Sequence, residues 1–341
     1  MDAFLRQPVD ARLRLFKETE ERLGIPARIV EKDFWVCWTL RQLFSLPEFG
    51  PHLTFKGGTS LSKVWGWVER FSEDIDVVLD RVWLGFGGKQ SPEAAPSAKQ
   101  RNARLGALKT ACRERIDSGL GPALETAVRS ALPADARWAL RRDEDDPDGQ
   151  TILFDYPGCW VGPADAYVLP MVKIEMGARS DDWPAEKATV KSYAAETFPQ
   201  AFADAACPVR VLAAERTFWE KATLLHEETY RPANKPRKAR MSRHYYDLWC
   251  LIRKGVADRA IAIRGLLDRV VEHRKAFFPR SWVDYATMRR GTLRLVPRAG
   301  QLAEWRSDYE AMRAEMFMGT PPPFDEVLAE VHRFEENFNR A

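Results

Sequence analysis

Two adjacent glycines, Gly57 and Gly58, follow a short apolar segment and precede an Asp-x-Asp motif. This order constrains the fold more than any other feature of the chain. Residues 52–56 predict a short strand, and residues 59–68 predict a helix with apolar residues on its inner face. Residues 74–79 predict a second strand, because they alternate and are rich in β-branched side chains. The sequence therefore predicts strand, glycine turn, helix and strand in succession.

The glycine turn is suited to a ligand that carries phosphate. Glycines have no Cβ, so a ligand can approach the backbone, and the start of a helix offers N–H groups and a positive dipole end to an anion. We expect Thr59 or Ser60 to cap this helix. The predicted nucleotide-binding residues are Gly57, Gly58, Thr59, Ser60, Lys63 and, from a later strand, Lys173.

Two carboxylates of the Asp-x-Asp motif are candidate metal ligands. Strand geometry points Asp74 and Asp76 to one face, where they can share divalent cations. Glu175, on a later predicted strand, would complete a carboxylate cluster for phosphoryl transfer. The alternatives are a charged hairpin edge for the two aspartates and, for Glu175, an ion pair with Lys173 on the same strand face. The sequence predicts Mg²⁺ bound by Asp74, Asp76 and Glu175.

Better-known nucleotide-binding patterns are absent from the sequence. The segment 56–60 lacks the GxxxxGK[ST] spacing of a P-loop, and no GxGxxG stretch or kinase HRD and DFG motifs occur. A nucleoside triphosphate would therefore be held by the glycine turn and by the metal ion.

The order of elements predicts an α+β fold. Strand patterns dominate residues 1–210, including further strands at 151–156 and 167–175, and helical patterns dominate 211–341. We therefore expect a nucleotide-binding core with a mixed sheet and an N-terminal helix, followed by a helical domain. An insertion near 85–150 is expected to hold a loop, a helix over 99–131 and an acidic turn.

Composition limits the class of protein and its location. The chain of 341 residues is 45% hydrophobic and 30% charged, and it contains no apolar run near 18 residues. The opening residues do not resemble a signal peptide, so we expect a cytoplasmic protein. Five cysteines without a CxxC pair predict reduced, mostly buried thiols.

Basic residues are concentrated in the second part of the chain. Segment 231–298 contains 18 Lys and Arg against 5 Asp and Glu. Such a segment suits a polyanion such as RNA, because each neutralised phosphate releases counterions; the alternative is a solvated basic surface. The predicted RNA-binding residues are Arg231, Lys235, Arg237, Lys238, Arg240 and Arg243.

A lysine and an aspartate lie on apolar helices in the second part. Lys221 stands at the edge of the apolar stripe of a helix that starts near Val211, and a lysine in that position needs an anionic partner. Asp247 lies inside a helix that is apolar almost all round, so it should be paired. A structural ion pair between the two residues and a catalytic role for both are alternative interpretations.

These residues together resemble the AbiEii/AbiGii-type nucleotidyltransferase toxins of bacterial abortive-infection and toxin–antitoxin systems. The block from the glycine pair to the Asp-x-Asp motif is the most specific part of the match. The other stretches are modest alone and gain weight from their order. The matching stretches, which span about two thirds of the chain, are 31–35, 55–61, 70–76, 173–175, 220–221 and 243–248.

The resemblance implies a DNA-polymerase-β-like nucleotidyltransferase core in which Asp74 and Asp76 bind Mg²⁺ and Lys221 and Asp247 belong to the active site. It implies transfer of a nucleoside monophosphate from a triphosphate to RNA, with the 3′ end of tRNA as the acceptor, and a cognate antitoxin protein. Two alternatives stay open. One is a degenerate fold that only binds RNA or a partner, and the other is an enzyme that modifies a protein or a small molecule.

Overall fold

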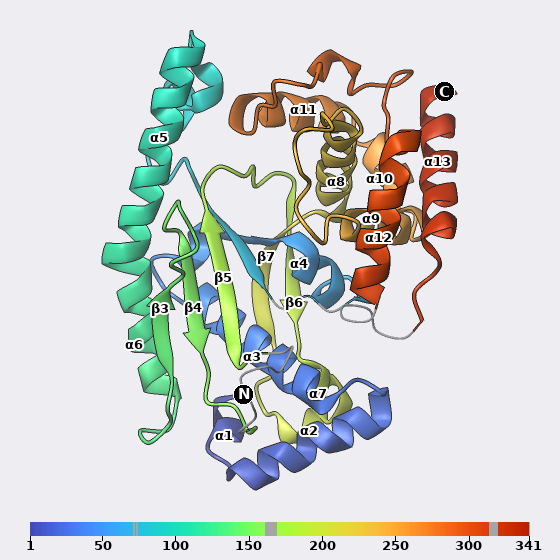
Figure 1. Ribbon diagram of the computed structural model, residues 1–341. Coiled ribbons are helices and arrows are strands. Elements are labelled where there is room, and N and C mark those ends of the chain that lie inside the picture. The colour runs from blue at the N-terminus through green and yellow to red at the C-terminus, as the bar shows by residue number, and fades with distance from the viewer. Residues whose placement is uncertain (71, 73, 161–168, 314–319, 341) are drawn as a thin grey trace. The chain divides into compact units, whose positions relative to one another are not determined.

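The computed structural model describes residues 1–70, 72, 74–160, 169–313 and 320–340 (Figure 1). The chain divides into two compact units. Unit 1 comprises Met1–Val64 and Ser72–Val211, and unit 2 comprises Trp65–Phe71 and Leu212–Ala341. The main division thus falls one residue from the boundary predicted between 210 and 211. The short segment 65–71 was assigned to the first part by the sequence, whereas here it packs with unit 2.

Unit 1 is built on a seven-stranded mixed sheet with the order β3-β4-β5-β2-β1-β7-β6. Strand β2 is antiparallel to β1 and parallel to β5, and β5 is antiparallel to β4. This sheet, with the helices of the second unit, confirms the predicted α+β fold class. The strands are β1 Leu53–Lys56, β2 Ile75–Leu79, β3 Ala139–Arg142, β4 Thr151–Asp155, β5 Met171–Gly177, β6 Ala185–Val190 and β7 Cys207–Leu212.

The first long helices of unit 1 form its core with the sheet. Helix α3 begins after Pro26, which suits a first helical turn, and its residues from Val30 to Leu40 are almost all buried. It packs against β5 and α6, and its Trp35 stacks on Tyr156 with ring centroids 5.1 Å apart. The helices of unit 1 are α1 Asp2–Leu5, α2 Val9–Leu23, α3 Ala27–Phe44, α4 Gly57–Lys63, α5 Ala98–Arg115, α6 Gly121–Ala131 and α7 Tyr193–Thr197.

The glycine pair lies inside α4 and does not precede it. The helix begins at Gly57, its N-cap is Lys56, and no side chain caps it. The prediction that Thr59 or Ser60 caps this helix was therefore wrong. The helix also ends at Lys63, so the predicted helical run to residue 68 was too long.

The predicted insertion is integrated into unit 1. The helix expected over 99–131 is formed by α5 and α6, joined by a π-helical turn at Ile116–Leu120. Both helices run beside the β3 side of the sheet (Figure 1). The strand β3 was not predicted, because only four residues of mixed polarity form it. The insertion therefore extends the sheet and does not form a separate lobe.

The predicted strand 151–156 corresponds to β4, and the predicted strand 167–175 is displaced toward its C-terminal end. Strand β5 begins at Met171, directly after Pro170. The start of the predicted segment, 167–168, lies outside the described residues. Strand β6 was missed because its Ala, Glu and Lys residues have low strand propensity and are mostly exposed.

Unit 2 is helical. Its core contains the aromatic cluster of Phe218, Trp219, Phe334 and Phe338, whose rings contact one another. The helices are α8 Ala214–Thr229, α9 Arg243–Arg253, α10 Val256–Ala262, α11 Leu266–Phe277, α12 Leu302–Arg313 and α13 Phe324–Arg340. The helical second part predicted from the sequence is therefore present.

All five cysteines are free and buried in the structure, so the predicted burial is confirmed. Among the described residues, none of the helices combines the length and the apolar character that crossing a membrane requires.

Candidate active site

The backbone of Gly57 lies directly against the carboxylate of Asp76. Gly57 has a φ of +84°, a conformation that glycine adopts at little cost. A Cβ at this position would collide with Oδ2 of Asp76. Both observations require glycine at position 57. Gly57 and Asp76, one of the predicted metal ligands, are therefore neighbours in unit 1.

The hydroxyl groups of the turn fix the backbone around these residues. The Thr59 hydroxyl donates to the carbonyl oxygen of Asp74 at 2.6 Å and lies 2.8 Å from the Ser72 hydroxyl. The Ser60 hydroxyl donates to the carbonyl oxygen of Gly57 at 2.8 Å. Both side chains are fully buried. Thr59 and Ser60 thus hold the turn and the start of β2 in place, and a ligand would meet backbone groups at this point.

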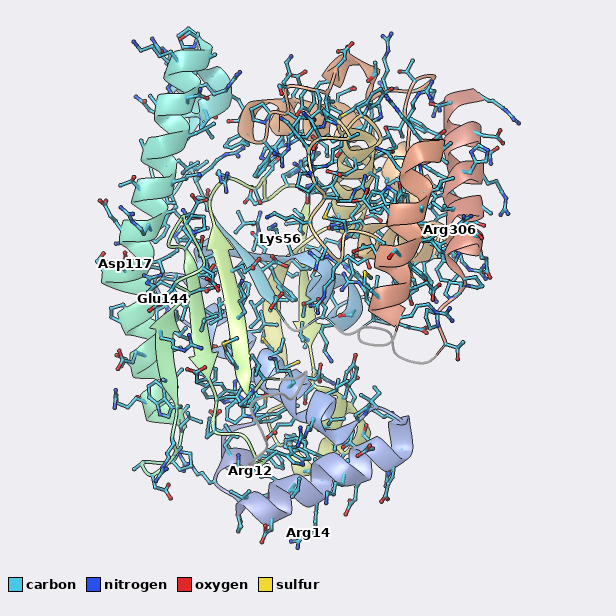
Figure 2. The ribbon with its side chains drawn as sticks, viewed as in Figure 1. Arg12, Arg14, Lys56, Asp117, Glu144 and Arg306 are labelled. Carbon is cyan, nitrogen blue, oxygen red and sulfur yellow. The ribbon has the colours of Figure 1, made fainter. Side chains whose placement is uncertain are left out.

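A row of charged side chains crosses the sheet at Asp76. Lys56 on β1 stands opposite Asp76 on β2, and Asp76 stands beside Glu175 on β5. Partners in register point to the same face of a sheet. Lys56, labelled in Figure 2, marks the position of this row on β1.

Glu175 has a basic partner on its own strand. Its carboxylate lies 3.1 Å from Nζ of Lys173, which also lies 3.1 Å from a carboxylate oxygen of Asp143. Burial by itself would lower the pKa of Lys173, but the hydrogen bonds to Asp143 and Glu175 outweigh it and raise that pKa. The ion pair that the sequence left open as an alternative is therefore formed. The role of Glu175 as a metal ligand and that of Lys173 in nucleotide binding stay predictions.

The donor chemistry at the start of β2 fits Mg²⁺. This ion prefers oxygen ligands and is commonly held by one or two carboxylates with substrate phosphates and water. Asp74 and Asp76 are both half-buried and lie two residues apart. Within the part of the chain that the structure describes, no three or more His, Cys, Asp or Glu side chains are grouped as a metal site. An ion held by Asp74 and Asp76 would complete its shell from other oxygen ligands, such as substrate phosphates and water.

Lys63 extends into the core of unit 1. Its ammonium group lies 2.7 Å from Oδ1 of Asp33 on α3, and both side chains are 5% exposed. The same group lies 3.7 Å from the centre of the Tyr193 ring. Burial would lower the pKa of Lys63, but Asp33 outweighs it and raises that pKa. The predicted phosphate contact by Lys63 would require breaking this buried pair, which instead anchors the end of α4 to α3.

Unit 2 contains a second charged cluster, centred on Asp247. This fully buried carboxylate accepts a hydrogen bond from Nε of Arg70 at 2.6 Å and another from a terminal nitrogen of Arg70 at 2.8 Å. Nζ of Lys221 donates to Oδ2 of Asp247 at 2.7 Å. The predicted partners Lys221 and Asp247 are therefore in contact. We refer to Arg70, Lys221 and Asp247 as the Asp247 cluster.

The charges of the Asp247 cluster shift the pKa values of its members. Burial would raise the pKa of Asp247, but Arg70 and Lys221 outweigh it and hold that pKa well below its usual range. Burial lowers the pKa of Lys221, and Asp247 only partly offsets this. Two cations, Arg70 and Lys221, thus contact the same buried carboxylate.

Arg70 is the site residue that sequence reasoning missed. It stands at the start of the matched stretch 70–76, but its pairing with Asp247 joins residues 177 positions apart. A single sequence contains no signal for a contact at that separation. The only available indication was the need of a buried aspartate for more than one donor.

The predicted RNA-binding residues separate into two groups. Arg231 and Arg237 both pair with Glu228, at 2.6 and 3.1 Å, and Arg237 also lies 2.6 Å from Glu304. The charges of these two arginines are therefore used in ion pairs within unit 2. Half-exposed Arg243 begins α9, and the exposed residues are Lys235, Lys238 and Arg240.

Comparison with known proteins identifies the family. A search of curated proteins found no match. A solved structure similar to this chain is that of MenT4, a nucleotidyltransferase toxin from Mycobacterium tuberculosis H37Rv. It is 15% identical, with a TM-score of 0.36, and the match covers 90% of this chain and 99% of that one. The family described as nucleotidyl transferase AbiEii toxin of Type IV toxin–antitoxin systems matches residues 38–330. Because this match covers most of the sequence, the chain belongs to the AbiEii family of nucleotidyltransferase toxins.

Proposed function

We propose that this toxin is a Mg²⁺-dependent enzyme that transfers a nucleoside monophosphate from a nucleoside triphosphate to an RNA acceptor. The observation that carries the proposal is the contact between the Gly57 backbone and the Asp76 carboxylate. It joins a backbone suited to phosphate with a carboxylate suited to Mg²⁺, and a triphosphate bound through Mg²⁺ needs both.

The residues of unit 1 would bind and orient the triphosphate. Asp74 and Asp76 would hold the metal ion, and N–H groups of the Gly57–Ser60 turn would face the phosphates. When bound, Mg²⁺ neutralises charge on the phosphate oxygens and lowers the pKa of the attacking hydroxyl group. Because Thr59 binds the Asp74 carbonyl group, the turn and the carboxylates keep a fixed spacing.

Lys221 and Asp247 would serve the same reaction by different means. A base for the attacking hydroxyl group must accept a proton near neutral pH. Asp247 has a pKa far below that range and is already bound by two cations. We therefore assign Asp247 to orienting Lys221, whose ammonium group would stabilise negative charge on the leaving pyrophosphate.

RNA is the acceptor that the basic segment 231–298 favours, and the family resemblance favours the 3′ end of tRNA. The exposed cations Lys235, Lys238 and Arg240 provide sequence-independent attraction for a phosphate backbone. A cognate antitoxin is expected from the family description, which names a Type IV toxin–antitoxin system.

The central experiment incubates the purified protein with total RNA, Mg²⁺ and each α-labelled triphosphate in turn. We expect label in RNA of tRNA size, and loss of label by at least about a thousandfold in Asp76→Asn, because a metal ligand is removed. The matched control is Asp80→Asn, one residue past the same strand, where the side-chain oxygen that accepts the Val82 N–H at 2.7 Å is kept.

Two outcomes would contradict the proposal. Undiminished labelling by Asp76→Asn would refute the site, and label found on protein or a small molecule instead of RNA would refute the acceptor. A protein that only binds RNA would give no label and would gain no thermal stability from Mg²⁺ and triphosphate, whereas a bound substrate must raise it.

A further inference from the structure

A cavity lies within unit 1, and none of its lining residues belongs to α4 or β2. Its volume is about 650 Å³, within the range of small-molecule sites. Its walls come from the segment 5–12, the segment 132–137 after α6, and residues 156–160 after β4 together with Pro170. Three parts of the chain that are distant in sequence thus enclose one hollow.

Among the residues that line the cavity, Arg12 has a buried side-chain nitrogen without a hydrogen-bond partner. Its side chain lies on α2 and the residue is only 8% exposed. Its Nε has no hydrogen-bond partner, and none of its nitrogens makes an ion pair within 4 Å among the described residues. The guanidinium group is close enough to Glu31 to lower the pKa of that carboxyl, although burial outweighs it. A buried guanidinium group with unused donors is costly unless an anion satisfies it.

The rest of the wall combines further cations and flat rings with apolar residues and one exposed carboxylate, Asp135. Arg6 and Arg137 are exposed and border the same cavity. The ring of Tyr156 stacks on Trp35, and the ring of Trp160 stacks on Phe16 at 6.4 Å, so core residues hold both wall rings in place. Such a lining suits a ligand with an anionic group at one end and a planar ring at the other.

The cavity is distinct from the place proposed for the triphosphate. Pro170 lies five residues before Glu175, which corresponds to roughly 17 Å along an extended chain. Figure 2 shows Arg12 near α1 and α2, well separated from Lys56 on β1. A ligand in this cavity would therefore be bound independently of Asp74 and Asp76.

We propose that this cavity is a binding site for a small aromatic phosphate of about the size of a nucleoside monophosphate. The phosphate group would accept paired hydrogen bonds from Arg12, and the positive charge of Arg137 would attract it. The ring of the ligand would lie against Tyr156 and Trp160. A nucleoside monophosphate and a non-nucleoside aryl phosphate share this chemistry. Neither Asp76 nor the Asp247 cluster takes part.

The test measures binding by calorimetry with the full-length Asp76→Asn variant, which weakens the proposed Mg²⁺–triphosphate site. The probes are AMP, phenyl phosphate, adenosine and inorganic phosphate. We expect saturable binding of AMP, of phenyl phosphate or of both, at least about tenfold tighter than adenosine or inorganic phosphate, because each of the latter lacks one of the two groups. Binding of phenyl phosphate without AMP would identify an aryl phosphate as the ligand class, and the reverse would identify a nucleotide.

Further substitutions locate the binding. Arg12→Lys keeps the positive charge near Glu31 but loses the paired donors, and should weaken binding about tenfold. Arg137→Ala removes an exposed wall cation and should weaken it about threefold without affecting folding. The control is Arg14→Ala, because Arg14 is exposed on the same helix and points away from the unit (Figure 2); it should change binding less than about twofold.

Three results would overturn the proposal. One is no saturable binding of AMP or phenyl phosphate at millimolar concentration. Another is equal affinity for the phosphates and for adenosine. The third is an equal effect of Arg137→Ala and Arg14→Ala, and this arm decides the matter even if Arg12→Lys fails to fold.

Discussion

The two units use aspartate in opposite ways. Asp74 and Asp76 of unit 1 are half-buried, and the Asp76 carboxylate lies against Gly57 at the start of α4. Asp247 of unit 2 is fully buried and is bound by Arg70 and Lys221. In the proposed function, the carboxylates that bind a diffusible cation keep access to solvent. A carboxylate bound by the protein's own cations instead serves to position them.

The contrast also separates activity from stability. Removing a ligand for an exchangeable ion affects the reaction and leaves the fold, whereas removing one charge from a buried cluster leaves the other charges uncompensated.

Asp247→Asn should cost about 3–5 kcal/mol in the free energy of unfolding of unit 2, because Arg70 and Lys221 would stay buried without the charge of the Asp247 carboxylate. Asp76→Asn should change the free energy of unfolding by less than about 1 kcal/mol. Urea denaturation of both variants provides the measurement. A similar loss of stability in the two variants would remove the distinction between the clusters.

The histidine His226 extends the comparison to pH. Its Nδ1 accepts the Arg294 N–H at 3.0 Å, and its Nε2 lies 3.0 Å from the Thr287 hydroxyl, which itself donates to a carbonyl oxygen. A proton on Nδ1 would therefore face another N–H. Burial, and next Arg294, lower the pKa of His226 to about 4. This side chain should stay neutral in the folded protein down to that pH.

The direction of the pH dependence of stability follows from which state, folded or unfolded, binds the proton at higher pH. The unfolded chain takes up this proton as the pH falls below about 6.5, and the folded protein takes it up only near pH 4. The free energy of unfolding should therefore fall by up to about 3 kcal/mol between these values and no further below them.

His226→Gln should reduce the pH dependence of the free energy of unfolding over that interval. The control is His332→Gln, because His332 is exposed on α13 and lies 3.7 Å from Glu336. Denaturation curves at half-unit steps from pH 4 to 7 measure both. An unchanged slope in His226→Gln would show that this histidine does not couple protonation to folding.

Gly57→Ala tests the backbone contact in unit 1. The new Cβ would displace the Asp76 carboxylate, so we expect a loss of nucleotide transfer of about a hundredfold, or about 2.7 kcal/mol. Gly85→Ala is the matched control in the same unit. Gly85 has a φ of +89°, and a Cβ there would have no neighbour within 4 Å. Both variants bear the same backbone strain, so equal transfer rates would show that the Gly57–Asp76 contact has no role in the reaction.

The parts of this structure that depend on residues close in sequence were predictable from the sequence. The glycine turn, β2 and its carboxylates were predictable because their signals lie within about 25 residues, and periodicity identified α3, α8 and α9. The Lys221–Asp247 contact was one of two stated alternatives. Arg70 was not predictable as their partner, because its contact depends on the folded arrangement of unit 2.

The direction of Lys63 and the start of α4 were not predictable either. A lysine just past a glycine turn suggests a phosphate ligand, but the ion pair with Asp33 becomes visible only once α3 and α4 pack together. Similarly, Thr59 and Ser60 look like helix caps in the sequence, and their hydroxyl groups instead bond to carbonyl groups of the turn and of the start of β2. When a polar side chain contacts a residue that is distant in the sequence, the residues next to it in the sequence do not predict that contact.

The smallest expected effect concerns the basic segment, where the comparison recurs between exposed and internal cations. Lys238→Ala removes an exposed charge and should weaken RNA binding about two- to threefold and lower the salt-dependence slope by about 1, because one phosphate contact is lost. Arg237→Ala should instead lower the free energy of unfolding, since Arg237 pairs with Glu228 and Glu304 and packs 3.9 Å from the centre of the Trp305 ring. Filter binding at several salt concentrations and urea denaturation separate the two effects, with Lys17→Ala, at an exposed position of α2, as the control. If Lys17→Ala lowered the slope as much as Lys238→Ala, the attraction for RNA would belong to the whole surface and not to this segment.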